Sequence, residues 1–194
     1  MKACGTLLLI LLVSGCGGPP TRFYTLAPVA PAATAGVPLA SCPTGPVAVN
    51  HVLLPETLDR QSVVRADGTE RLDISNQDRW AAPLDGMIQH VLAEDLRNRL
   101  PADRVLMPGD APPPGGSAGI DINIQRFVGD AAGHVALRVD WTLLNRHKTV
   151  VATQSEAINA DAASAGTDSL VAAMSRAVGD LADRIVVVLQ KCPA

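Results

Sequence analysis

The sequence predicts an α+β domain, a two-layer sandwich in which a mainly antiparallel sheet carries two amphipathic helices on one face. Three observations lead to it. Two stretches place apolar residues at helical three-four spacing, several others look like strands, and they follow one another as four strands, a helix, three strands and a helix. At 194 residues, the chain has room for one such domain.

The first half of the domain contains the four early strands. They are apolar, aromatic or β-branched runs bounded by Pro, Gly and Asp, which are typical of strand ends. The last two flank Asp67-Gly68, a strong signal for a tight hairpin turn. The predicted strands are Arg22–Leu26, Val47–Leu54, Ser62–Arg65 and Glu70–Ser75.

Two helices are predicted from stripes of apolar residues on one side. The first follows Pro83, which suits a first helical turn, and the second follows a cap at Thr167 or Asp168. Polar residues lie off both stripes, so each helix should pack on a flat surface such as a sheet. The stripes are Leu84, Met87, Ile88, Val91, Leu92, Leu96 and Leu100, and then Leu170, Val171, Met174, Val178, Leu181, Ile185 and Val188.

The three later strands lie between these helices. Apolar residues alternate along Ile120–Ile124 and Val135–Leu143, as in half-buried strands. A short Gly-bounded segment joins these two, and a turn before Val150–Ile158 leads into the third. We therefore expect an antiparallel meander.

The N-terminus predicts export and lipidation. An apolar run, Leu7–Val13, follows the single cation Lys2 and is closed by Val13-Ser14-Gly15-Cys16, as in a bacterial lipoprotein signal. Cys16 would carry a diacylglyceryl group and its amine a further acyl chain such as palmitate, which together anchor firmly. The alternative is an ordinary secretory signal cut near Cys16.

The predicted organisation follows from this cleavage site. Residues 1–15 are the lipoprotein signal peptide, residues 16–21 a lipidated tether, and residues 22–194 a single periplasmic domain with a Pro/Ala-rich loop at 28–46. Gly17 follows the cysteine, where lipoproteins kept at the inner membrane of enterobacteria usually carry Asp. By that resemblance, we expect the periplasmic face of the outer membrane rather than the inner membrane.

Two cysteines, Cys42 and Cys192, remain in the domain. In an oxidising periplasm a disulfide between them is expected, and closing so long a loop would contribute roughly 4–5 kcal/mol in the chain-entropy model. Two separately buried free thiols are the alternative.

No pattern predicts an enzyme, a cofactor, a metal site or nucleic-acid binding. The four histidines are far apart, no phosphate-binding loop occurs, and a net charge of −3 offers no basic block. Gly115-Gly116-Ser117-Ala118-Gly119 has the letters of a hydrolase nucleophile elbow, but three prolines precede it and a predicted strand follows. A strand before the serine and a helix after it are what the elbow needs. We interpret this segment as a flexible loop.

Three segments together resemble the ABC-type transport auxiliary lipoproteins, the family of the Pqi-type component. They are Arg22–Leu26, Leu54–Arg60 and Arg79–Leu84, in that order behind the lipoprotein signal. Where family members often have an aromatic residue before Leu-Asp-Arg, this chain has Thr57. The resemblance implies a non-catalytic periplasmic lipoprotein that partners an MCE-domain protein in lipid transport between the two membranes.

The same resemblance singles out partner contacts at Leu58, Asp59, Arg60 and Trp80. For the Leu-Asp-Arg segment, the alternative is a strand end whose Asp59 and Arg60 stabilise the turn. For Trp80, the alternative is a core residue at the helix entry. Two other functions stay open, a subunit of an outer-membrane assembly machine and a monomeric lipid carrier. Self-association into a ring would suit a cap on an MCE tube.

Overall fold

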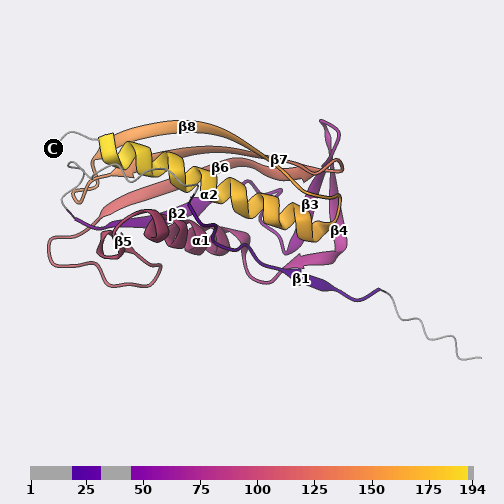
Figure 1. Cartoon of the computed structure of the whole chain (residues 1–194), viewed down its shortest axis with the longest axis horizontal. Coiled ribbons are helices and arrows are strands. Elements are labelled where there is room, and N and C mark those ends of the chain that lie inside the picture. Colours follow the sequence, from indigo (N-terminus) through magenta and orange to yellow (C-terminus); the bar gives the residue numbers. More distant parts are fainter. Residues whose placement is uncertain (1–18, 32–44, 192–194) are drawn as a thin grey trace, which may run out of the picture.

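Eight strands, two α-helices and a short 3₁₀ helix make up the described part of the chain, residues 19–31 and 45–191 of a computed structural model (Figure 1). The elements are β1 (Arg22–Tyr24), β2 (Val47–Leu53), β3 (Ser62–Asp67), β4 (Arg71–Trp80), α1 (Leu84–Arg99), η1 (Ala102–Arg104), β5 (Val105–Leu106), β6 (Ala118–Asp130), β7 (His134–Leu144), β8 (Val150–Asp161) and α2 (Thr167–Lys191). The predicted signal peptide, Cys16, Cys42 and Cys192 lie outside the described residues.

The predicted meander is confirmed in β6, β7 and β8. These strands pair antiparallel in sequence order. Along β7 every second residue, from Val135 to Leu143, is buried, while the residues between them are partly exposed. This alternation places one face of the meander in the core.

The other edge of β6 is shared by two parallel strands. β2 pairs with its first half, from Val47 opposite Ala118, and β3 pairs with its end, where Arg65 lies opposite Gly129. β1 also pairs parallel with β4, and β5 with β2. The α+β class is therefore confirmed, and the sheet is mixed: its longest pairings, β6 with β7 and β7 with β8, are antiparallel, whereas β1, β2 and β5 have parallel partners. Alternation within a strand carries no information about the direction of partners that are distant in sequence.

Both helices pack on the sheet and on each other. α1 contacts β2, and α2 contacts β7 and β8 (Figure 1). Their predicted apolar stripes are largely buried, with Ile88, Leu92 and Ile185 fully inaccessible. α2 approaches β6 closely at Gly129, where an added Cβ would lie 2.1 Å from Cδ1 of Leu170. A larger residue at position 129 would have to push the buried Leu170 side chain aside.

A strap, residues 26–29, runs from β1 between the two helices (Figure 1). Its Ala27 N–H donates to Oγ of Ser175 on α2 at 3.1 Å, and its Val29 N–H donates to Oδ1 of Asp95 on α1 at 2.7 Å. Arg99 of α1 donates to the Val29 carbonyl at 3.1 Å. The predicted loop at 28–46 therefore begins with residues held by both helices, which its composition did not indicate.

The strap is held by a buried charged cluster, and this cluster should make the free energy of unfolding depend on pH. Burial raises the pKa of Asp95 from 3.8 to about 6, against the opposing hydrogen bond from Val29 and the charge of Arg99. Between these two pKa values the native state binds more protons than the unfolded state. The contribution of Asp95 to the free energy of unfolding is therefore full below pH 4 and is lost as the pH rises through 6.

We expect Asp95→Asn to remove this dependence. From pH 4 to pH 7, the free energy of unfolding of the wild type should fall by roughly 2–3 kcal/mol relative to that of the variant. Urea unfolding of both proteins at several pH values measures the difference. If the difference in unfolding free energy between the two proteins stays constant with pH, or grows in favour of the wild type, the pKa of Asp95 is not raised.

Candidate functional site

The three segments singled out in the sequence meet at one end of the molecule. Tyr24 of β1 lies beside Trp80 at the end of β4, and the Ala81 N–H donates to the Tyr24 carbonyl at 2.8 Å. The Trp80 N–H donates to the carbonyl of Gln61, just after the Leu-Asp-Arg segment, at 2.6 Å. We call this meeting point, residues 22–26, 54–61 and 79–84, the N-terminal junction.

The four predicted contact residues divide into two kinds. Leu58 and Trp80 are each 4% exposed and belong to the core. Asp59 and Arg60 are exposed, and in the described part of the chain neither side chain has a hydrogen-bond or ion-pair partner. The turn is closed by backbone bonds, including Leu58 N–H to the Pro55 carbonyl at 2.8 Å. Asp59 and Arg60 are thus available to a partner, whereas Leu58 and Trp80 support the turn from beneath.

A buried carboxylate, Asp78, fixes β1 to the rest of the domain. Arg22 Nε donates to its Oδ1 at 2.9 Å, and Thr167 Oγ1, at the start of α2, donates to its Oδ2 at 2.7 Å. Burial raises the pKa of Asp78, but the hydrogen bonds from Thr167 and Arg22 outweigh it and hold the pKa below its usual value. Arg65 of β3 donates to the same Thr167 hydroxyl. No local pattern in the sequence points to Asp78, because its partners are 56 and 89 residues away.

An apolar groove of about 470 Å³ opens beside the junction. The residues just after β1, the loop before α1 and the first turns of α1 line it, with Thr25, Leu26, Ala82, Pro83, Met87 and His90 among its residues. The groove is open to solvent and lacks an arrangement of titratable groups that would suggest chemistry.

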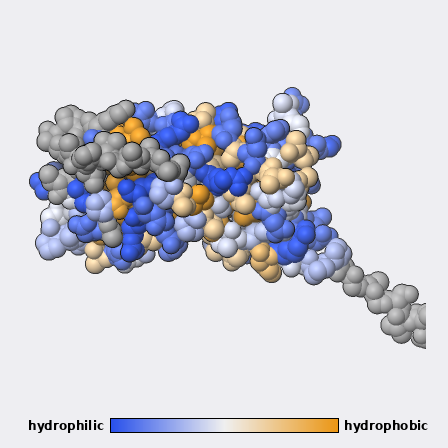
Figure 2. Space-filling view, viewed as in Figure 1, coloured by the Kyte–Doolittle hydropathy of each residue, from blue (hydrophilic) through white to orange (hydrophobic). Residues whose placement is uncertain are grey.

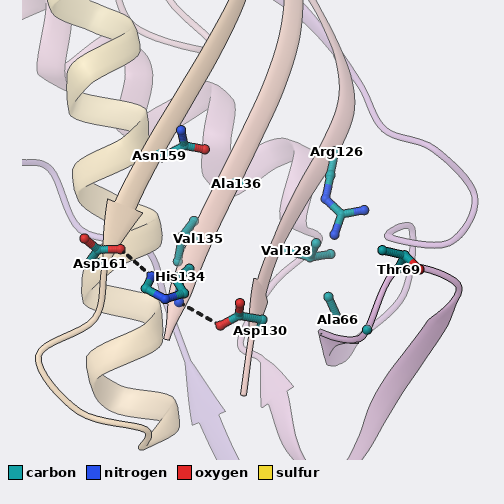
Figure 3. Close-up of a pocket in the computed structure, with 11 residues that line it drawn as sticks. Ala66, Thr69, Arg126, Val128, Asp130, His134, Val135, Ala136, Asn159 and Asp161 are labelled. Carbon is teal, nitrogen blue, oxygen red and sulfur yellow. Dashed lines mark hydrogen bonds and ion pairs between the residues drawn. The ribbon is translucent and has the colours of Figure 1, made fainter. Parts of the chain in front are cut away.

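A second hollow, of about 570 Å³, lies between the β3–β4 turn and strands β6 to β8 (Figure 3). His134 Nδ1 lies 2.7 Å from Oδ1 of Asp161, and this hydrogen bond raises the pKa of His134. Asp130 accepts the His134 backbone N–H at 2.9 Å. Arg126 enters from the opposite side (Figure 3). The pair is joined to no serine or cysteine by any hydrogen bond that the structure describes, so it suggests no nucleophilic catalysis.

The serine of the Gly-rich loop has the context that the sequence predicts. Ser117 follows Gly115 and Gly116, whose φ angles are 95° and 81°, and it directly precedes β6. A nucleophile elbow needs a strand before the serine and a helix after it. Within residues 19–31 and 45–191, no group of three potential ligands is placed to hold a metal ion. Neither helix described there is long and apolar enough to cross a membrane.

Comparison with solved structures shows that this fold occurs elsewhere. An uncharacterised protein of known crystal structure aligns with a TM-score of 0.72 and 18% identity, over 87% of this chain and 98% of its own. Protein XCC0632 from Xanthomonas campestris, of family DUF330, aligns with a TM-score of 0.68 and 18% identity, over 88% of this chain and 95% of its own. No curated protein sequence matches the chain.

The family is shown by a match along the sequence. The family model of the ABC-type transport auxiliary lipoprotein component matches residues 24–186, which include α1, most of α2 and all of the described strands except the first two residues of β1. The matched region covers most of the N-terminal junction. The chain therefore belongs to the family of ABC-type transport auxiliary lipoprotein components.

Proposed function

We propose that this protein is a lipid-anchored accessory subunit at the periplasmic face of the outer membrane. It serves an MCE/ABC-type system that moves lipids between the membranes, contributes to envelope integrity, and has no catalysis of its own. The observation that carries the proposal is family membership together with the junction, which presents the exposed Asp59 and Arg60 close to the anchored end of the chain.

The tether keeps the junction near the membrane. Residues 16–21 separate the proposed lipid at Cys16 from β1, and six extended residues span at most about 20 Å. β1 is fixed to the body by the Arg22–Asp78 ion pair at 2.8 Å. A partner that reaches the membrane would therefore meet Asp59 and Arg60 there.

The structure favours docking over carriage of a lipid inside the domain. A monomeric carrier needs an enclosed apolar cavity, but the space between helices and sheet is filled by buried side chains such as Trp141, Phe127 and Leu92. Apart from the grey atoms, Figure 2 shows a largely hydrophilic face on the helix side, with hydrophobic residues in separate patches. Ring formation by identical subunits stays compatible with this role and is part of the proposal.

Charge reversal at the junction tests the docking role. We expect Asp59→Lys and Arg60→Glu each to reduce the amount of MCE-domain protein recovered after in vivo crosslinking by about tenfold, as when a charged contact is lost. The matched control is Glu70→Lys, because Glu70 is an exposed acid on the β3–β4 turn. Mass spectrometry of the purified, crosslinked lipoprotein measures the recovery.

Two results would contradict the proposal. Equal recovery from all variants would remove Asp59 and Arg60 from the contact. Recovery of an outer-membrane assembly protein in place of an MCE-domain protein would instead support the role of an assembly subunit.

A further inference from the structure

Phe23 is an aromatic side chain that the fold leaves outside its core. It is 67% exposed, the largest exposed fraction among the large hydrophobic residues of the described chain. Its neighbour Tyr24 is buried, since alternate residues of β1 face opposite ways. Phe23 therefore contributes little to the core and is free to contact something outside the domain.

The strand that carries Phe23 is at an edge of the sheet and at one end of the molecule. Within residues 19–31 and 45–191, β1 pairs with β4 alone. The chain leaves the body beyond β1 in the direction of the N-terminus (Figure 1). The opposite end carries β5 and the turn between β7 and β8. β6, with 13 residues, spans about 40 Å between the two ends.

From this placement we infer that the β1 edge lies against the membrane surface, with the Phe23 ring among the lipid headgroups. The inference rests on the proposed lipid anchor at Cys16. Seven residues from Cys16 to Phe23 reach at most about 25 Å, which is shorter than the domain. The anchor thus presents β1, rather than the far end, to the bilayer.

The chemistry around Phe23 suits an interface of lipid headgroups. Aromatic rings are favoured at this depth because they are apolar but tolerate a polar boundary. The register partner of Phe23 is Arg79, a half-buried residue beside it on β4. A guanidinium group binds phosphate oxygens well. The nearest buried acid, Asp78, is already neutralised by Arg22 and so does not repel phosphate.

Fluorescence quenching by lipids tests the contact in the acylated full-length protein. Vesicles of phosphatidylethanolamine and phosphatidylglycerol whose acyl chains are brominated next to the headgroups quench only indole rings that lie at the membrane surface. The native Trp80 and Trp141 are buried, and the emission of the wild-type protein measures their background. Phe23→Trp adds a probe at the proposed contact. Val150→Trp, at a 59% exposed residue beside the β7–β8 turn, adds a matched probe at the far end.

We expect the emission added by Phe23→Trp to be lost in brominated vesicles, and the emission added by Val150→Trp to persist. A second outcome is that the protein binds the vesicles with neither probe quenched, or with both quenched. Either result would contradict the proposed orientation but not the lipid anchor. If the wild-type protein does not float with vesicles, the anchor at Cys16 fails, and the inference fails with it. Loss of partner crosslinking at Asp59 is a separate readout, so the two proposals can fail independently.

Discussion

Substitution of Arg99 by methionine should lower the free energy of unfolding by about 3–5 kcal/mol, as expected when one partner of a buried ionic cluster is removed. The Arg99 side chain is 4% exposed. It donates from Nε to Oδ1 of Asp183 at 2.6 Å and from Nη1 to the Asp95 and Val29 carbonyls at 2.9 and 3.1 Å. Arg99 thereby joins α1, α2 and the strap, and its loss leaves the Asp95 carboxyl buried without a nearby cation.

Thermal or urea unfolding of the variant measures this loss. The control is Arg97→Met on the same helix, because Arg97 is exposed and the change should lie within about 0.5 kcal/mol of wild type. Adding Asp95→Asn to Arg99→Met should recover part of the stability, since the uncompensated buried carboxyl is then gone. A single Arg99→Met variant as stable as the Arg97→Met control would show that the cluster does not hold the helices together.

Trp80→Ala should cost about 3–5 kcal/mol of unfolding free energy, the range for removing a large aromatic side chain from a core. Trp80 is 4% exposed and lies where β1, β4 and the turn before β3 meet. Its removal leaves a cavity beneath all three segments. Chemical denaturation followed by far-UV circular dichroism measures the change.

Arg60→Ala is the control that separates a residue stabilising the fold from a residue contacting the partner. Arg60 is exposed on the same junction, so its truncation should leave stability within about 0.5 kcal/mol of wild type and change only partner recovery. If Trp80→Ala instead proved as stable as wild type, Trp80 would be a surface contact and its core position would be wrong.

Local patterns predicted most elements of this fold because they report on burial along one segment. The stripe from Leu84 to Leu96 and the alternation from Val135 to Leu143 correspond to α1 and β7 nearly to their ends. The two-residue strand β5 was missed, since two residues are too few to show a period. The parallel pairing of β2 with β6 was also missed, because 70 residues separate Val47 from its partner Ala118 and no local signal reports on it.

The candidate site was predicted in outline but not in its division of roles. Sequence resemblance brought out Leu58, Asp59, Arg60 and Trp80 as one group, because it cannot tell buried from exposed residues. The structure separates the two core residues from the two exposed ones. Phe23 was treated as part of an ordinary strand. With only three residues in β1, the sequence could not show which side chain faces outward.

The pairing of β1 with β4 also decides how the domain carries mechanical load. A force between the lipid anchor and the folded body pulls on the N-terminal end of β1, along the axis of a strand that runs parallel to its partner. The bonds that join β1 to β4 then bear the load together rather than breaking one after another. Further along the chain, the strap is held again by the bonds from Ala27 to Ser175 and between Val29 and Asp95 and Arg99. Tension applied at the N-terminal end of the domain would therefore meet two successive attachments along the chain, first at β1 and then at the strap.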